Sequence, residues 1–188
     1  MWEGKNVTVF VTGGIAAFKA ATLVRLFVKA GANVEVAMTK SACEFITPLT
    51  FQVLTKNKVH TDTFDEVEAS KVQHIHLADK TDVAVVVPAT ANTIAKMANG
   101  IADTFVTSTL LATTAPIYVA PAMNEHMWEN PATVRNVAQL KADGKIIIEP
   151  ATGFLAEGYN GKGRLPEPEE IFEQVTFFEN RRLYGSPL

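Results

Sequence analysis

Short runs of apolar, largely β-branched residues recur along this chain, separated by longer intervals. They cover residues 7–11, 33–38, 82–87, 117–120 and 145–148. Most of these runs are continuously apolar and do not alternate with polar residues, so a strand built from them is buried on both faces. A parallel sheet covered by helices on both sides satisfies that requirement, and the sequence therefore predicts an α/β fold.

Helical patterns fill the intervals between the strands. From Ala17 to Val28 the apolar residues recur at i, i+3, i+4 and i+7, which predicts an amphipathic helix that ends at Gly31. Further helices are expected at 93–112, at 131–142 and after Pro166 and Pro168. Right-handed crossovers then give one doubly wound, mostly parallel, Rossmann-like domain over residues 1–180, followed by a tail at 181–188.

Charge and cysteine content exclude several classes of protein. The chain carries 17 basic and 20 acidic side chains, a net charge of −3, which argues against a nucleic-acid partner. No apolar run approaches the roughly 20 residues that cross a bilayer, so no membrane partner is expected. The single cysteine, Cys43, cannot form an internal disulfide, and a reducing, cytoplasmic setting is expected.

Four unusual segments follow the carboxyl ends of predicted strands, at 12–16, 88–93, 121–128 and 153–164. In open α/β sheets ligands bind at this edge. Gly13 and Gly14 leave free amides at the start of a helix, which suits a phosphate group. The segment matches neither the dinucleotide fingerprint nor a Walker A loop, so a mononucleotide is favoured over a dinucleotide or ATP. A tight turn without a ligand is the alternative.

Polar residues in the other segments have both functional and structural interpretations. Thr90 and Asn92 either contact a ligand or cap the following helix. Asn124, after a Pro-Ala-Met turn, suggests recognition of a polar ligand group. His74 and His76 have no spaced third and fourth metal ligand, so no metal site is expected. His74 is instead a candidate for acid–base chemistry or for a capping role.

Taken together, these segments resemble the family of homo-oligomeric flavin-containing cysteine decarboxylases. The marks that carry the resemblance are Pro88-Ala-Thr-Ala-Asn-Thr93, Pro121-Ala-Met-Asn-x-x-Met-Trp128 and a His74-Ile75 step, 14 residues before Pro88. The resemblance covers residues 5–175. It implies FMN as the cofactor and self-association into trimers or multiples of trimers, with sites at subunit interfaces.

The resemblance also implies roles for individual residues. FMN would contact Gly13, Gly14, Ile15 and Thr39 with its phosphate and ribityl chain, and Pro88, Ala89, Thr90, Ala91, Asn92 and Ala122 with its ring system. His74 would be catalytic, and Asn124 would hold the substrate carboxylate with Met127 nearby. Residues 150–165 would form a flexible lid, on which Lys162 and Arg164 are charge partners for a substrate phosphate.

The implied activity is that of a carboxy-lyase, the FMN-dependent conversion of 4′-phospho-N-pantothenoylcysteine to 4′-phosphopantetheine in coenzyme A biosynthesis. By this resemblance, the cysteine side chain would pass a hydride to FMN, carbon dioxide would leave the resulting thioaldehyde, and reduced FMN would return the hydride.

The chain departs from the family at Glu157, where the lid usually has a cysteine that helps to protonate the product. This departure leaves an oxidative peptidyl-cysteine decarboxylase open as an alternative. A non-catalytic FMN-binding regulatory subunit and a flavin prenyltransferase are further alternatives. Glu157 can donate this proton if burial beneath the lid raises its pKa, whereas a solvated, ionised Glu157 is a poorer donor than a thiol. The sequence leaves both open, and the full redox cycle is the leading prediction.

Overall fold

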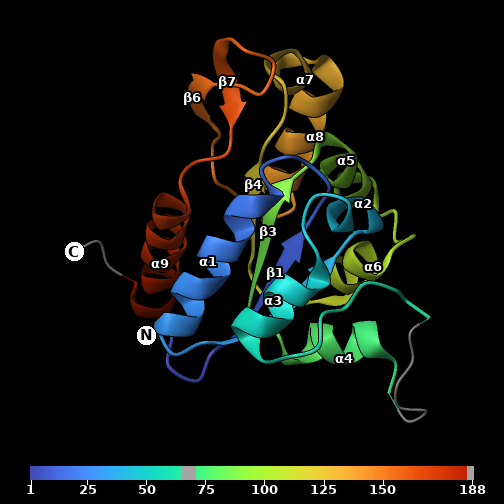
Figure 1. The fold of residues 1–188 in the computed structure, drawn as a ribbon, viewed down its shortest axis with the longest axis vertical. Coiled ribbons are helices and arrows are strands. Elements are labelled where there is room, and N and C mark those ends of the chain that lie inside the picture. The colour runs from blue at the N-terminus through green and yellow to red at the C-terminus, as the bar shows by residue number, and fades with distance from the viewer. Residues whose placement is uncertain (65–70, 186–188) are drawn as a thin grey trace.

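A central sheet of five parallel strands organises the chain (Figure 1). The computed structural model describes residues 1–64 and 71–185. The strand order is β2-β1-β3-β4-β5. The strands are β1 (Asn6–Val11), β2 (Asn33–Met38), β3 (Val83–Ala89), β4 (Ile117–Pro121) and β5 (Ile146–Ile147). The predicted doubly wound parallel sheet is confirmed, although its last strand is shorter than expected.

Helices cover both faces of the sheet. One face carries α1 (Ala17–Lys29), α3 (Pro48–Thr55) and α9 (Pro168–Tyr184). The other face carries α4 (Gln73–Lys80), α5 (Ala91–Asn99), α6 (Phe105–Ala112) and α8 (Pro131–Ala142). Two short helices, α2 (Lys40–Cys43) and α7 (Glu125–Glu129), follow β2 and β4. Among the described residues, none of these helices is long and apolar enough to cross a membrane.

The core consists of two clusters, one on each side of the sheet. In β1, Val7, Val9 and Val11 pack against α1, whereas Phe10 packs with α4 and α6 on the other side. Successive side chains of a strand point to opposite faces. Both faces of β1 are therefore apolar because both are covered by helices, which explains the continuous apolar run in the sequence.

Two predicted helices end at different residues in the structure. The prediction of one continuous helix at 93–112 is wrong. Helix α5 ends before Gly100, which adopts a left-handed conformation (φ 67°). A new helix, α6, then starts after Thr104, whose side chain accepts a hydrogen bond from the Thr107 amide. At the carboxyl end, α9 continues to Tyr184, so residues 181–184 of the expected tail are helical. Residues 186–188 lie outside the described part.

The segment expected to form a lid is a β-hairpin. Strands β6 (Ala151–Phe154) and β7 (Asn160–Arg164) pair antiparallel and lie above the carboxyl edge of the main sheet (Figure 1). Gly163 (φ 137°) approaches the chain after β4 so closely that a Cβ atom would collide with the Met123 carbonyl oxygen. The Met123 amide donates to the Gly163 carbonyl oxygen at 3.0 Å, which docks β7 onto this segment.

Candidate functional site

The strand order places a topological switch point between β1 and β3. The chain leaves β1 toward β2 on one side and later crosses back to place β3 on the other. Open α/β sheets of this order bind ligands at that point, outside the carboxyl ends of the strands. Thr12, directly after β1, donates its hydroxyl to the Pro88 carbonyl and accepts from the Thr90 amide at 3.0 Å. These bonds hold the loops after β1 and β3 side by side.

A cavity of about 610 Å³ lies between these loops and the hairpin, and we call it the hairpin cavity. Most of the residues expected in the site line it: Gly13, Gly14, Ile15, Pro88, Thr90, Ala91, Asn92, Ala122, Asn124, Met127, Glu157 and Arg164. Segments far apart in the sequence therefore converge on one space. Its volume is within the range of about 300–1,000 Å³ that is usual for small-molecule sites.

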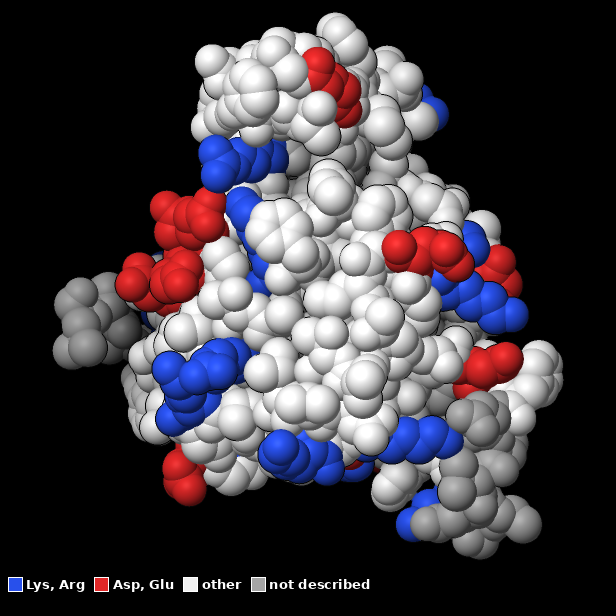
Figure 2. Space-filling view, in the orientation of Figure 1, with Lys and Arg blue, Asp and Glu red and all other residues white. Residues whose placement is uncertain are grey.

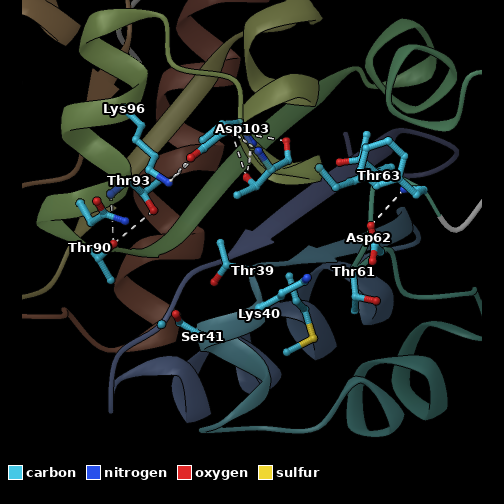
Figure 3. A pocket seen from close by; sticks show the side chains of 17 residues that line it. Thr39, Lys40, Ser41, Thr61, Asp62, Thr63, Thr90, Thr93, Lys96 and Asp103 are labelled. Atoms are coloured by element: carbon cyan, nitrogen blue, oxygen red, sulfur yellow. Dashed lines mark hydrogen bonds and ion pairs between the residues drawn. The ribbon is translucent and has the colours of Figure 1, made fainter.

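A second cavity of about 420 Å³ adjoins the first and shares Gly13, Thr90 and Asn92 with it. Its walls carry many hydroxyl groups, from residues 39–41, 61–63 and the first turns of α5 and α6 (Figure 3), and we call it the threonine cavity. Thr39, expected near a phosphate, lies here. At one side Lys96 hydrogen-bonds both carboxylate oxygens of Asp103, at 2.9 and 3.0 Å, which lowers the pKa of that carboxyl.

The loop between β1 and α1 offers unused hydrogen-bond donors. Among the hydrogen bonds of the described residues, the amides of Gly13, Gly14 and Ile15 have no protein acceptor. A Cβ atom built on Gly14 meets nothing within 4 Å, so this part of the loop faces open space. Free amides beside a helix start form a site for an anionic group.

Asn124 lies in the hairpin cavity as the N-cap of α7. Its Oδ1 accepts from the His126 amide at 2.9 Å, and its Nδ2 donates to the Tyr159 hydroxyl at 2.9 Å. Both ends of the side-chain amide therefore have partners, which define its orientation.

Two basic side chains line the same cavity, Arg164 from β7 and Lys19 from α1. Both contact Oε1 of Glu167, at 2.9 Å from Arg164 and 3.1 Å from Lys19. The hydrogen bond from Lys19 is the main cause that lowers the pKa of Glu167. Sequence reasoning missed Lys19, because helical periodicity puts it outside the apolar stripe of α1. Its side chain is nevertheless only 12% exposed.

Lys162 does not line the hairpin cavity, unlike its predicted counterpart Arg164. Its ammonium group lies over the Trp128 ring, 5.9 Å from the centroid, and 3.7 Å from a carboxylate oxygen of Glu149. In a regular strand, residues two positions apart point to the same face. Between Lys162 and Arg164, however, Gly163 has a φ of 137° and departs from regular strand geometry, so this rule does not hold for the pair. The structure therefore places Arg164, but not Lys162, at the hairpin cavity, and the role of both residues toward a phosphate stays a prediction.

Ala89 also lies outside both cavities. It is fully buried in β3, within the cluster that faces α5 and α6. Its carbonyl oxygen accepts from the Ala122 amide at 3.2 Å, so it supports the loop after β4 from behind.

His74 is separated from the other expected site residues. It lies in the first turn of α4, at the opposite end of the view from α7 and the hairpin (Figure 1), and lines neither cavity described above. Its ring forms a T-shaped pair with Phe105, with ring centroids 6.4 Å apart. Phe105 in turn stacks on His60, with ring centroids 5.0 Å apart. Its Nδ1 is buried without a hydrogen-bond partner among the described residues. A single chain therefore does not bring His74 to Asn124.

Potential metal ligands do not cluster in the described ranges 1–64 and 71–185. No group of three or more His, Cys, Asp or Glu side chains in them is placed to hold a metal ion. Cys43 is a free thiol at the end of α2, and burial raises its pKa.

Comparison with known proteins identifies the family. Residues 1–178 match the flavoprotein family. The chain is 56% identical over 171 residues to the coenzyme A biosynthesis bifunctional protein CoaBC of Bacillus subtilis (strain 168), covering 91% of this chain and 42% of that protein. The chain thus spans less than half the length of this curated relative.

Solved structures show the same similarity. A PPC decarboxylase variant complexed with pantothenoylaminoethenethiol superposes with a TM-score of 0.83 at 32% identity, covering 95% of this chain and 100% of that one. The FMN-dependent cysteine decarboxylase SpaF superposes with a TM-score of 0.77 at 32% identity, covering 93% and 99%. The resemblance inferred from the motifs is confirmed, and this chain belongs to the flavoprotein family.

Proposed function

We propose that this chain is an FMN-dependent decarboxylase that converts 4′-phospho-N-pantothenoylcysteine to 4′-phosphopantetheine in coenzyme A synthesis. The observation that carries this proposal is the hairpin cavity, in which Asn124 and the pair formed by Lys19 and Arg164 share one space with the glycine loop. Similarity to CoaBC and to PPC decarboxylase supports the reaction class. The cytoplasm is the corresponding setting. The proposed catalytic domain is residues 1–180, with 150–165 as its lid.

The residues present fit FMN. Free amides at Gly13, Gly14 and Ile15 and the Thr39 hydroxyl suit its phosphate and ribityl chain. Pro88, Thr90, Ala91, Asn92 and Ala122 surround the space beside them with mostly small side chains, which leaves room for a flat ring system. When bound, FMN would supply the hydride acceptor for oxidation of the cysteine side chain to a thioaldehyde, whose C=S group would accept the electron pair that carbon dioxide leaves behind.

The polar groups of the cavity match the charged ends of the substrate. The Asn124 amide binds the cysteine carboxylate through an N–H donor, with Met127 beside it. Lys19 and Arg164, already held together by Glu167, bind the phosphate through charge-assisted hydrogen bonds. Among the described residues that line the hairpin cavity, Glu157 is the one carboxylic acid, and we assign to it the proton that completes the product.

A second copy of the chain supplies His74 in this proposal. One chain holds His74 away from the hairpin cavity, so a complete reaction centre requires His74 from a neighbouring subunit. Ile15, Phe18 and Phe154 line the mouth of the cavity with 58–65% of their surface exposed. The face over α1 and α3 carries charged side chains mainly at its margin (Figure 2). These features support self-association, and the expected assembly is a trimer or a multiple of trimers.

Incubation of the purified flavoprotein with 4′-phospho-N-pantothenoylcysteine tests the proposal. Mass spectrometry of the product is combined with the flavin absorbance. We expect loss of carbon dioxide alone and a flavin that ends oxidised. If the substrate stays unchanged while the bound flavin remains oxidised, the proposal is contradicted.

An oxidative decarboxylase is the second candidate, because Glu157 replaces the usual lid cysteine and the FMN-dependent cysteine decarboxylase SpaF has a similar structure. It predicts loss of carbon dioxide plus two hydrogens, together with a bleached flavin. A peptide with a carboxyl-terminal cysteine, offered in parallel, distinguishes this candidate by its substrate.

A further inference from the structure

Tyr159 forms a direct bond between the hairpin and the floor of the hairpin cavity. It closes the turn between β6 and β7, where the Leu155 amide donates to its carbonyl oxygen at 2.8 Å. The residue is 37% exposed, and its hydroxyl accepts from Nδ2 of Asn124 at 2.9 Å. Tyr159 does not line the cavity itself, so any effect on a ligand acts through Asn124.

The two hydrogen bonds of Asn124 determine what its amide presents to the cavity. Oδ1 is occupied by the His126 N–H, and one hydrogen of Nδ2 is occupied by Tyr159. A half-turn of the amide would place its NH₂ group against the His126 N–H, so that two donors would face each other. The amide is therefore held with its second N–H donor free for a ligand, which suits a carboxylate and not a cation.

The hairpin is attached on both sides of Asn124. The Met123 amide donates to the Gly163 carbonyl at 3.0 Å, and the Lys162 amide donates to Oε1 of Glu125 at 2.9 Å. Asn124 lies between Met123 and Glu125, and its hydrogen bond to Tyr159 adds a third contact with the hairpin. Docking of the hairpin and orientation of the Asn124 amide are thus linked through one phenol.

We propose that Tyr159 is a positioning residue that makes carboxylate recognition by Asn124 depend on the docked hairpin. The inference rests on the proposed function, because it takes the carboxylate of the cysteine portion as the group that Asn124 binds. Tyr159 contributes to affinity for ligands that carry this carboxylate and contributes nothing to ligands that lack it.

Two unreactive probes that differ by the carboxylate alone test this role. 4′-Phospho-N-pantothenoylserine keeps the carboxylate, 4′-phospho-N-pantothenoylethanolamine lacks it, and neither contains the sulfur that the reaction requires. Each is titrated into the FMN-loaded protein. Tyr159→Phe should weaken the serine probe about 2- to 10-fold, the range of one lost hydrogen bond, and leave the ethanolamine probe unchanged. Tyr184→Phe, a tyrosine on α9 that is 73% exposed, should change neither.

Equal weakening of both probes, or no weakening of either, would overturn the positioning role. Repeating Tyr159→Phe in an Asn124→Ala background adds a second criterion, because an effect that passes through Asn124 must disappear there. A further loss for the serine probe in that background would show that Tyr159 acts by another route.

The proposed function can fail separately. If the unaltered protein binds neither probe, the substrate assignment is wrong, and the test of Tyr159 moves to hydrogen exchange of residues 151–164. Faster exchange in Tyr159→Phe than in Tyr184→Phe would retain the link between Tyr159 and hairpin docking. Equal exchange in the two variants would end it.

Discussion

Two regions of the molecule differ in how much of the candidate site one chain provides. They are the carboxyl edge beneath the hairpin and the first turn of α4. At the carboxyl edge, Asn124, Glu157 and Arg164 line a single cavity, and hydrogen bonds orient both Asn124 and Arg164. On α4, His74 packs against Phe105 and faces neither cavity. One chain thus builds the cavity at the carboxyl edge and leaves His74 outside it. In the proposed function, a neighbouring subunit supplies this residue.

The largest expected effect comes from the α4 side. His74→Asn should lower turnover by about 10²- to 10⁴-fold, the usual contribution of a proton-transferring group. The flavin content should remain unchanged, because His74 lines neither of the cavities assigned to the cofactor. Steady-state turnover and the ratio of flavin to protein absorbance measure the two quantities. Normal turnover would remove His74 from the reaction.

A mixed assembly tests whether the two regions meet across subunits. His74→Asn and Asn124→Asp, each inactive alone, are co-expressed with different tags and purified together. In each mixed trimer, one interface in three combines the intact His74 of one chain with the intact Asn124 of its neighbour, so about a third of the activity should return. Activity no greater than that of the separate variants would mean that both residues act within one chain.

The basic pair of the hairpin cavity should have a smaller effect. Lys19→Gln removes one charge-assisted hydrogen bond to the substrate phosphate, and the KM should rise about 10-fold. The KM for the dephosphorylated substrate should stay the same, since that substrate lacks the anionic group. Lys162→Gln is the matched control, because Lys162 lies over Trp128 outside the cavity. An equal rise for both substrates would contradict the assignment of Lys19.

The smallest effect concerns the attachment of α4 to β2. Glu35 contacts Lys80 and lies 3.0 Å from His60. Burial opposes ionisation of Glu35, but the hydrogen bonds from His60 and Lys80 prevail and lower its pKa below the ordinary value of a glutamate. A lowered carboxyl pKa stabilises the fold above the unfolded-state pKa, and this stabilisation is lost as the pH falls through the folded-state value.

Between pH 6 and pH 4, the free energy of unfolding should therefore fall more in the unaltered protein than in Glu35→Gln. A difference of about 0.5–1 kcal/mol is expected for such a pair, measured by urea denaturation at each pH. Glu149→Gln, which removes a half-exposed partner of Lys141, should follow the unaltered protein closely. The same pH dependence in Glu35→Gln would show that Glu35 does not contribute.

Local sequence patterns predicted much of the fold. Apolar runs indicated the strands, and the helix at 131–142 has the predicted bounds. The division of 93–112 into two helices was missed, although its cause is local: Gly100 ends α5 in a left-handed conformation, and Thr104 caps α6. The hairpin was predicted as a lid but not as paired strands, because its glycine-rich sequence has little apolar alternation.

What the sequence determined by itself is the burial pattern and the composition of the loops that follow each strand. These are local properties, and parallel strands bring such loops to one edge, so Gly13, Thr90 and Asn124 could be assigned to the site in advance. Tertiary structure decided which side chains meet there. Docking of the hairpin placed Tyr159 on Asn124. Packing of α9 beside α1 brought Glu167 to Lys19, and Arg164 contacts the same carboxylate. Lys162 and His74 lie elsewhere. Such contacts join residues up to 148 positions apart, so they depend on how the elements pack and not on spacing along the chain.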